Sequence, residues 1–282
     1  MNKKILFIDI DGTLVDFGIS SIPKSAFIAL EKAHENGHRL VLCTGRNVFE
    51  MDEVLLSLPI DAYIYNSGAN AEVNGNPLYE IFYPKQAMKD VVAYGKKHDI
   101  GISMICKQAT YSDTFTIEVF SKIFLEGMDE HHPEALKMKA VAKAMKPLDA
   151  MQEKDYEEVY KFAFYTRDPH ICDAFLETLP SYCDGFYSYD EEKHIAEGEA
   201  GNRAASKAYG MDRILDYFQV SKEQSMAFGD SLNDREMLQH AAISVAMGNA
   251  HPDLKAMADF VTDNVQNDGL YKAFMTLGLI TP

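Results

Sequence analysis

The chain has 282 residues, of which 47% are hydrophobic, so it can form one large domain or two of moderate size. Its formal net charge of −16 opposes non-specific binding to nucleic acid and to anionic membranes. The apolar run at residues 5–8 stops at Asp9, too early for a signal sequence, and no stretch is long enough to span a membrane. None of the four cysteines lies in a CxxC pair, so we expect a cytoplasmic protein with reduced thiols.

The elements predicted in the first part of the chain alternate between strands and helices. An apolar run at residues 4–10 predicts a buried strand, and Pro23 opens a helical pattern that ends near Gly37. The elements that follow are a strand at 39–43, a helix at 47–57, a strand at 62–65 and a hairpin at 70–82. Alternation of buried strands with helices is typical of a parallel α/β sheet.

The middle of the chain does not show this alternation. The elements predicted there are helices at 84–98, 115–127 and 168–180 and strands at 159–166 and 182–189, with solvated surface at the acidic run 190–199. Alternation returns afterwards, with helices at 203–217 and 232–239 and strands at 225–228, 242–246 and 260–262. The simplest arrangement is a Rossmann-like α/β core formed by residues 1–82 and 195–282, interrupted by an inserted α+β domain at 83–194.

Two acidic residues stand directly after the first predicted strand. Asp9 and Asp11 are separated by one residue and are followed by Gly12 in the string DIDGTLV. Open α/β sheets bind ligands outside the carboxyl ends of their strands, where a carboxylate pair suits Mg²⁺ and a glycine lets backbone amides approach a phosphate. Acids that end a strand and Asp-Gly turns are common, so the two acids alone are weak evidence for such a site. The whole string makes chance a poor explanation.

The segment Thr44-Gly45-Arg46 comes directly after the second predicted strand. The Thr44 hydroxyl and the Gly45 amide can both donate to a phosphoryl oxygen at a strand end. Thr44 alone also fits the N-cap of the next helix, and Arg46 fits a solvated residue at its start. Lys207, further along the chain, is by itself an ordinary surface lysine.

A second acidic segment, with the string GDSLND, follows the predicted strand at 225–228. It brings Asp230, Asn233 and Asp234 to another strand end. A helix cap with an acid in the first turn explains one of the two carboxylates, but it does not explain the whole string.

Four segments of the chain resemble, in the same order, the four motifs of the haloacid dehalogenase (HAD) superfamily of phosphotransferases. They are DIDGT, TGR, Lys207 and GDSLND. The strings NSGA at 66–69, MGNA at 247–250 and DG at 268–269 are similar to those of its Cof-type phosphatases. The insert matches the type IIB cap of these enzymes in position and approximate length. The resemblance covers nearly all of the core and implies a HAD fold with a cap that sets substrate specificity.

The resemblance also implies a magnesium-dependent phosphatase that forms an aspartyl-phosphate. Asp9 would be the nucleophile and a metal ligand. Asp11 would protonate the leaving alcohol and then deprotonate water, and its backbone oxygen would touch the metal. The remaining roles are phosphoryl binding by Thr44 and Lys207, metal binding by Asp230 and Asp234, phosphate contact by Asn233, and lining of the phosphate pocket by Gly12, Gly45 and Arg46.

The lysine is the point at which the chain departs from the family pattern. Many relatives have Lys-Gly where this chain has Lys207-Ala208, which leaves Lys193 and Lys222 as alternatives. Lys207 has the best spacing to the GDSLND string and is the expected residue.

Several other functions are alternatives to a phosphatase. Dehalogenases and ion-pumping ATPases lack the second acid of the DxD pair and are disfavoured, whereas a phosphomutase, which has it, stays open. A cysteine phosphatase needs a Cys-x5-Arg loop, but only two residues separate Cys43 from Arg46. A phosphate-binding module without turnover is the non-enzymatic alternative. The expected substrate is a small phosphate ester. The breadth of the family favours a sugar phosphate, with pyridoxal phosphate or flavin mononucleotide as alternatives.

Overall fold

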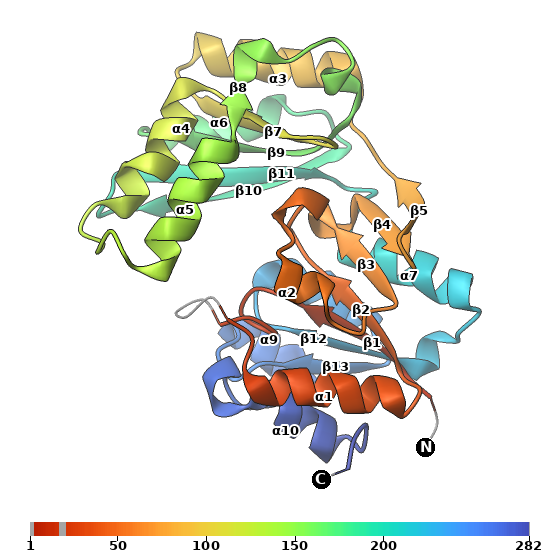
Figure 1. Ribbon diagram of the computed structural model, residues 1–282. Helices are drawn as coiled ribbons and strands as arrows, with labels where there is room; N and C mark the ends of the chain where they lie inside the picture. The colour runs from red at the N-terminus through yellow and green to blue at the C-terminus, as the bar shows by residue number, and fades with distance from the viewer. Residues whose placement is uncertain (1–2, 17–20, 282) are drawn as a thin grey trace. The chain divides into compact units, whose positions relative to one another are not determined.

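The computed structural model describes residues 3–16 and 21–281, and the chain divides into two compact units (Figure 1). The core unit comprises Met1–Glu80 and Ala205–Pro282, and the inserted unit comprises Ile81–Ala204. Each unit has hydrophobic clusters made only of its own residues. Within the described residues, no helix combines the length and the apolar composition needed to cross a bilayer.

The core unit is built on an eight-stranded sheet with the order β14-β13-β12-β1-β2-β3-β4-β5. The strands are β1 (Ile5–Asp9), β2 (Arg39–Cys43), β3 (Ala62–Tyr65), β4 (Asn70–Val73), β5 (Asn76–Glu80), β12 (Ser225–Gly229), β13 (Ile243–Ala246) and β14 (Phe260–Val261). Strands β14 through β3 are parallel, and β4 and β5 add an antiparallel edge. Because β1 lies between β2 and β12, the carboxyl ends of these three strands meet at one edge of the sheet.

Helices cover both faces of this sheet. They are α1 (Lys24–Glu35), α2 (Glu53–Leu56), α7 (Lys207–Phe218), α8 (Arg235–His240), α9 (Pro252–Met257) and α10 (Gly269–Thr276). Leu6 and Ile8 of β1 pack in the cluster that contains α1 and α10, whereas Ile5 and Phe7 pack in the cluster that contains α7 and α8. A strand buried on both faces is apolar throughout, which is why β1 has no polar alternation. The predicted Rossmann-like α/β core is confirmed.

The inserted unit is an α+β structure, as predicted. Its six-stranded sheet has the order β10-β11-β9-β6-β7-β8 and is antiparallel except for the pair β7-β8. The strands are β6 (Gly101–Cys106), β7 (Thr110–Ser112), β8 (Lys146–Pro147), β9 (Val159–Thr166), β10 (Cys183–Asp190) and β11 (Ile195–Asn202), and the helices are α3 (Lys85–Lys97), α4 (Thr114–Ser121), α5 (Pro133–Ala144) and α6 (His170–Thr178).

The predicted boundary after residue 194 lies too early in the chain. Strand β11 starts there and pairs with β10 on one side and β9 on the other, so it belongs to the inserted unit. Its residues alternate, with small side chains at Ala196 and Ala200 buried and with Glu197 exposed. The stretch was predicted as acidic surface because the small inward residues give little apolar signal.

The predicted helix at 47–57 is instead two short helices. Asn47 caps a 3-10 helix at Val48–Glu50, and Asp52 caps α2, with Asp52 Oδ1 accepting a bond of 2.9 Å from the Leu55 amide. Asn47 and Asp52 are both N-caps, and a second helix start only five positions after the first interrupts the helical pattern.

Candidate active site

The turn after β1 brings the first acidic motif against the second. Asp9 ends β1 and is 5% exposed. Gly12 has a φ of +91°, and a Cβ there would lie 2.2 Å from Oδ2 of Asp230. The next residue, Thr13, donates a hydrogen bond of 2.9 Å from its hydroxyl to Asp230 Oδ1. Only glycine therefore lets this turn lie directly on the Asp230 carboxylate.

Thr44 sits at the carboxyl end of β2 and is almost fully buried. Its amide donates to the carbonyl of Ile64, and its own carbonyl accepts from the Ser67 amide, so the backbone is held on both sides. The hydroxyl accepts a bond of 3.0 Å from the Arg46 amide, which leaves the hydroxyl proton for a bound anion. The helix that follows is capped by Asn47, so Thr44 does not have the N-cap role that was its alternative.

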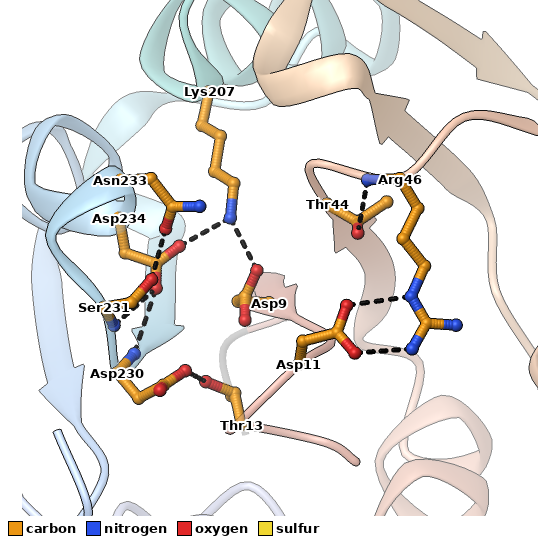
Figure 2. A network of polar contacts seen from close by, with 10 residues as sticks. All are labelled: Asp9, Asp11, Thr13, Thr44, Arg46, Lys207, Asp230, Ser231, Asn233 and Asp234. Atoms are coloured by element: carbon orange, nitrogen blue, oxygen red, sulfur yellow. Dashed lines mark hydrogen bonds and ion pairs between the residues drawn. The ribbon is translucent and has the colours of Figure 1, made fainter. Parts of the chain in front are cut away.

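Lys207 is the first residue of α7 and is 2% exposed. Its Nζ lies 2.5 Å from Oδ1 of Asp9 and 2.6 Å from Oδ1 of Asp234 (Figure 2). The start of α7 is fixed by Ser206, which caps the helix, and by Gly68, where a Cβ would lie 2.1 Å from the Ser206 carbonyl oxygen. The NSGA string thus allows the close approach that brings this lysine to the end of β1.

The other predicted alternatives lie elsewhere. Lys193 donates from Nζ to the carbonyl of Phe124 within the inserted unit, and Lys222 lies on an exposed 3-10 turn. Cys43 is completely buried, and burial raises the pKa of its thiol, which agrees with excluding a cysteine phosphatase.

Three carboxylates converge beside Lys207. Oxygens of Asp9, Asp230 and Asp234 all lie within 4.8 Å of one another, and all three residues are buried. Asp234 is oriented by the amides of Asp230 and Ser231, which donate to its Oδ2 at 3.0 and 3.1 Å. Three carboxylates against one ammonium leave a formal charge of −2. A set of hard oxygen donors with this charge fits Mg²⁺.

The pKa shifts reflect the same excess of negative charge. Burial, and then the charge of Asp234, hold the pKa of Asp9 well above its usual value in spite of Lys207. Burial and Asp234 likewise raise the pKa of Asp230 to about 7. Burial would lower the pKa of Lys207, but Asp234 and Asp9 outweigh it and raise that pKa. A further cation is what would keep all three carboxylates ionised at neutral pH.

Asp11 has a different partner. Arg46 donates from Nε to Asp11 Oδ2 at 2.8 Å and from Nη2 to Asp11 Oδ1 at 2.5 Å (Figure 2). Burial would lower the pKa of Arg46, but the bond with Asp11 contributes to raising it. The side chain of Asp11 is therefore turned to Arg46, and the metal contact expected through its backbone oxygen stays a prediction.

A cavity of about 250 Å³ opens beside these groups. It is lined by Asp9, Asp11, Gly45, Arg46, Glu50, Ser231 and Asn233. Asn233 Oδ1 accepts from the Ser231 hydroxyl at 2.5 Å, so the Asn233 amide nitrogen turns toward Lys207 (Figure 2). Every residue predicted for the site lies in the core unit. Of these residues, the cavity lining includes Asp9, Asp11, Gly45, Arg46 and Asn233, and it does not include Gly12, Thr44, Lys207, Asp230 or Asp234.

Sequence reasoning missed Asn249 as a residue that supports the site. Its Nδ2 donates to the Gly12 carbonyl at 2.7 Å, and its Oδ1 accepts from the Val265 amide at 3.2 Å. It therefore ties the turn after β1 to the loops that follow β13 and β14. The MGNA string contained this asparagine, but no role followed from its spacing.

Known proteins resemble this chain over nearly its whole length. The family model for haloacid dehalogenase-like hydrolases matches residues 6–274. The pyridoxal phosphate phosphatase YbhA of Escherichia coli (strain K12) is 25% identical over 96% of this chain and 97% of its own. A solved HAD phosphatase from Bacteroides thetaiotaomicron has a TM-score of 0.80 at 28% identity, covering 99% of this chain and 96% of that one. A HAD subclass IIB sugar phosphatase has a TM-score of 0.78 at 28% identity, covering 99% and 100%.

Proposed function

Because the chain belongs to the family of haloacid dehalogenase-like hydrolases and is a phosphatase of its Cof type, we propose that it hydrolyses a small phosphate monoester with Mg²⁺ through a phospho-aspartate on Asp9. The observation that carries this proposal is the buried group of Asp9, Asp230, Asp234 and Lys207 at the carboxyl end of the parallel sheet. A carboxylate nucleophile beside a cation site and a phosphoryl-binding lysine is what two successive displacements at phosphorus require.

In the proposed reaction the two acids have different roles. An oxygen of Asp9 attacks phosphorus, and the bond to the ester oxygen breaks as that oxygen takes a proton from Asp11. Water then attacks the phosphorus of the phospho-aspartate while Asp11 takes its proton, which releases inorganic phosphate and restores both side chains. Asp9, Asp230 and Asp234 would hold Mg²⁺, whose positive charge would offset the repulsion between Asp9 and the anionic ester.

The remaining groups hold the phosphoryl oxygens. The Lys207 ammonium already lies against Asp9, on the side where transferred oxygens carry negative charge. The Asn233 amide nitrogen turns toward Lys207 (Figure 2), and the Thr44 hydroxyl, which accepts from the Arg46 amide, keeps its proton for a phosphoryl oxygen. Their contribution is positioning and charge stabilisation, which dominate catalysis of phosphoryl transfer.

We further propose that the substrate is a sugar phosphate and that the inserted unit acts as a cap that selects it. The sugar phosphatase of subclass IIB, 28% identical over 99% of this chain, supports the sugar phosphate. The similarity to a pyridoxal phosphate phosphatase supports a cofactor phosphate as the second candidate. The inserted unit has its own hydrophobic core, so it is a separate domain, and in this proposal it supplies the contacts with the leaving group.

The test is release of inorganic phosphate by the purified chain from a panel of hexose phosphates, pyridoxal phosphate and flavin mononucleotide. We expect EDTA to stop release and Mg²⁺ to restore it, with Ca²⁺ a poor substitute because its larger shell misplaces the nucleophile. Phosphate binding without release would identify a binding module. An isomeric phosphate ester in place of inorganic phosphate would identify a mutase. Full activity after exhaustive chelation would contradict the metal requirement.

A further inference from the structure

Asp11 belongs to the same short motif as Asp9, yet its carboxylate faces a different partner. Both of its oxygens accept hydrogen bonds from one guanidinium, through Nε and Nη2 of Arg46. The group of described acids whose oxygens converge for a metal consists of Asp9, Asp230 and Asp234. Figure 2 shows Asp11 between Asp9 and Arg46, turned toward the arginine. The two acids of one motif thus have different partners: Asp9 contacts Lys207, and Asp11 is held by the arginine of another motif.

Arg46 reaches Asp11 from a backbone that is held on both sides. Its amide donates to Thr44 Oγ1 at 3.0 Å, and its carbonyl accepts from the Asn66 amide at 3.0 Å. Its side chain is only 13% exposed, and that of Asp11 is 29% exposed. The pair is therefore a two-point contact from a fixed loop, unlike exposed ion pairs that contribute little.

The surroundings of Arg46 also argue against a direct role in phosphate binding. Besides Asp11, the charges of Asp52 and Glu50 act on the guanidinium, and Glu50 lines the same cavity. Arg46 has two of its donors on Asp11, so its charge is engaged by that carboxylate. Arg46 lines the cavity beside Asp9, but its guanidinium is held by Asp11 there.

We propose that Arg46 is the positioning residue of Asp11: its two-point ion pair keeps the Asp11 carboxylate out of the metal site and holds it where it can take the proton of the attacking water. The proton gained in that step is the one that Asp11 gives to the leaving-group oxygen of the next substrate. The inference rests on the proposed acid and base roles of Asp11. A carboxylate two residues from Asp9 can reach the same cation, and a fourth carboxylate would give the site the ligand-rich character that suits Ca²⁺. An acid bound to the metal could not serve the leaving group. The planar fork of arginine matches a carboxylate at two points, whereas lysine would hold it at one.

The first measurement needs no catalysis. Calorimetric titration with Mg²⁺ and with Ca²⁺, in the absence of substrate, compares the wild-type chain with Arg46→Gln, Asp11→Asn and the double variant. We expect Arg46→Gln to raise Ca²⁺ affinity severalfold relative to Mg²⁺, because Asp11 can then join the site. Loss of a positive charge alone would strengthen both divalent ions alike, so the ratio isolates the added ligand. In the double variant the ratio should return to the wild-type value.

The second measurement is kinetic and uses Arg46→Lys, which keeps the charge but not the fork, and Arg213→Gln as a control from an exposed ion pair on α7. We expect Arg46→Gln to lower kcat by about 10- to 100-fold with KM changed by less than about threefold. Arg46→Lys should recover only part of kcat, and the control should match wild type. Circular dichroism checks the fold, and Arg46→Lys carries both measurements if Arg46→Gln unfolds.

Two results would overturn the inference. An unchanged Ca²⁺ to Mg²⁺ ratio in Arg46→Gln would show that Asp11 is kept away from the metal by something else. A large rise in KM with kcat unchanged would show that Arg46 binds the phosphate. Neither result bears on whether Asp9 is phosphorylated, so the proposed function stands or falls separately.

Discussion

Nζ of Lys207 lies 2.5 Å from Oδ1 of Asp9, although 198 positions separate the two residues in the chain. Both side chains are buried at the end of the central strand of the core sheet. The same ammonium contacts Asp234 at 2.6 Å, so one cation balances part of a group of three carboxylates. The stability of this part of the core and the proposed chemistry therefore depend on the same contacts.

Asp9→Asn should abolish hydrolysis without unfolding the protein. The amide does not attack phosphorus, and we expect kcat to fall by at least about 10⁴-fold. The fold should persist because the change removes one of three crowded carboxylates while Lys207 keeps its contact with Asp234. Phosphate release and circular dichroism measure the two effects, and Asp216→Asn, on an exposed part of α7, serves as control. A folded Asp9→Asn variant with near wild-type rate would refute the mechanism.

Asp11→Asn should separate the two displacements. p-Nitrophenolate leaves without a proton, so Asp9 should still be phosphorylated, but water then lacks its base. Rapid mixing with p-nitrophenyl phosphate should give a burst near one equivalent per chain and then a steady rate lower by about 10²- to 10⁴-fold. Mass spectrometry should find the phosphate on Asp9. Turnover at an undiminished rate, or a slow rate without a burst or trapped phosphate, would contradict these roles.

Lys207→Met should destabilise the metal-free protein. The variant leaves Asp9 and Asp234 buried without their ammonium partner, and breaking a buried pair in this way costs about 3–5 kcal/mol. Chemical denaturation in EDTA measures the loss, and Mg²⁺ should restore part of it. The exposed Lys222→Met serves as control and should stay within about 0.5 kcal/mol of wild type. Equal stability of the two variants would show that Lys207 does not balance the carboxylates.

The metal-free protein should lose stability as pH rises through neutrality. Burial and Asp234 raise the pKa of Asp230 from its ordinary 3.8 to about 7, so the folded state holds this proton more tightly than the unfolded state. The stabilisation is fully present below the ordinary pKa and is lost as pH rises through about 7, at about 1.4 kcal/mol for each unit of pKa difference.

Thermal unfolding in EDTA between about pH 5 and about pH 8 checks this expectation, with Asp230→Asn as the matched variant. The slope of Tm against pH should be shallower in the variant, because it has no proton to lose at this position. Mg²⁺ should raise the wild-type Tm more at the alkaline end, where it replaces the lost proton. Parallel slopes for the two proteins would contradict the raised pKa.

Replacing Ile81–Ala204 with a short Gly/Ser linker should change specificity more than basic chemistry. The core unit has its own hydrophobic clusters and holds every predicted site residue, so some hydrolysis of p-nitrophenyl phosphate should remain. The value of kcat/KM for the preferred metabolite should fall much further, because only that substrate would use contacts from the cap. Circular dichroism confirms the fold of the shortened chain. Equal losses for both substrates would place specificity in the core loops.

The inserted sheet shows where sequence patterns lose information. Strand β9 was predicted at residues 159–166, its observed bounds, because its large apolar and aromatic residues give a strong signal. Strand β11 was missed because its inward residues are as small as Ala196 and its outward residues are acidic. A strand of that composition is stabilised by its two neighbours, and local propensity does not reveal them.

The sequence by itself determined the parallel core and the chemical character of its edge. Apolar runs that end in Asp9, Thr44 and Asp230 place these side chains at the carboxyl ends of strands, and parallel strands bring their ends together. Only the tertiary structure decided which partner each group takes. Their own residue patterns left Lys207 an ordinary surface lysine and Arg46 a solvated residue at a helix start, and only the family resemblance placed them in the site. The close approach at Gly68 and the two-point pair with Asp11 give each its partner. Strand ends follow from local periodicity, whereas these contacts join residues far apart in the chain whose geometry no local pattern encodes.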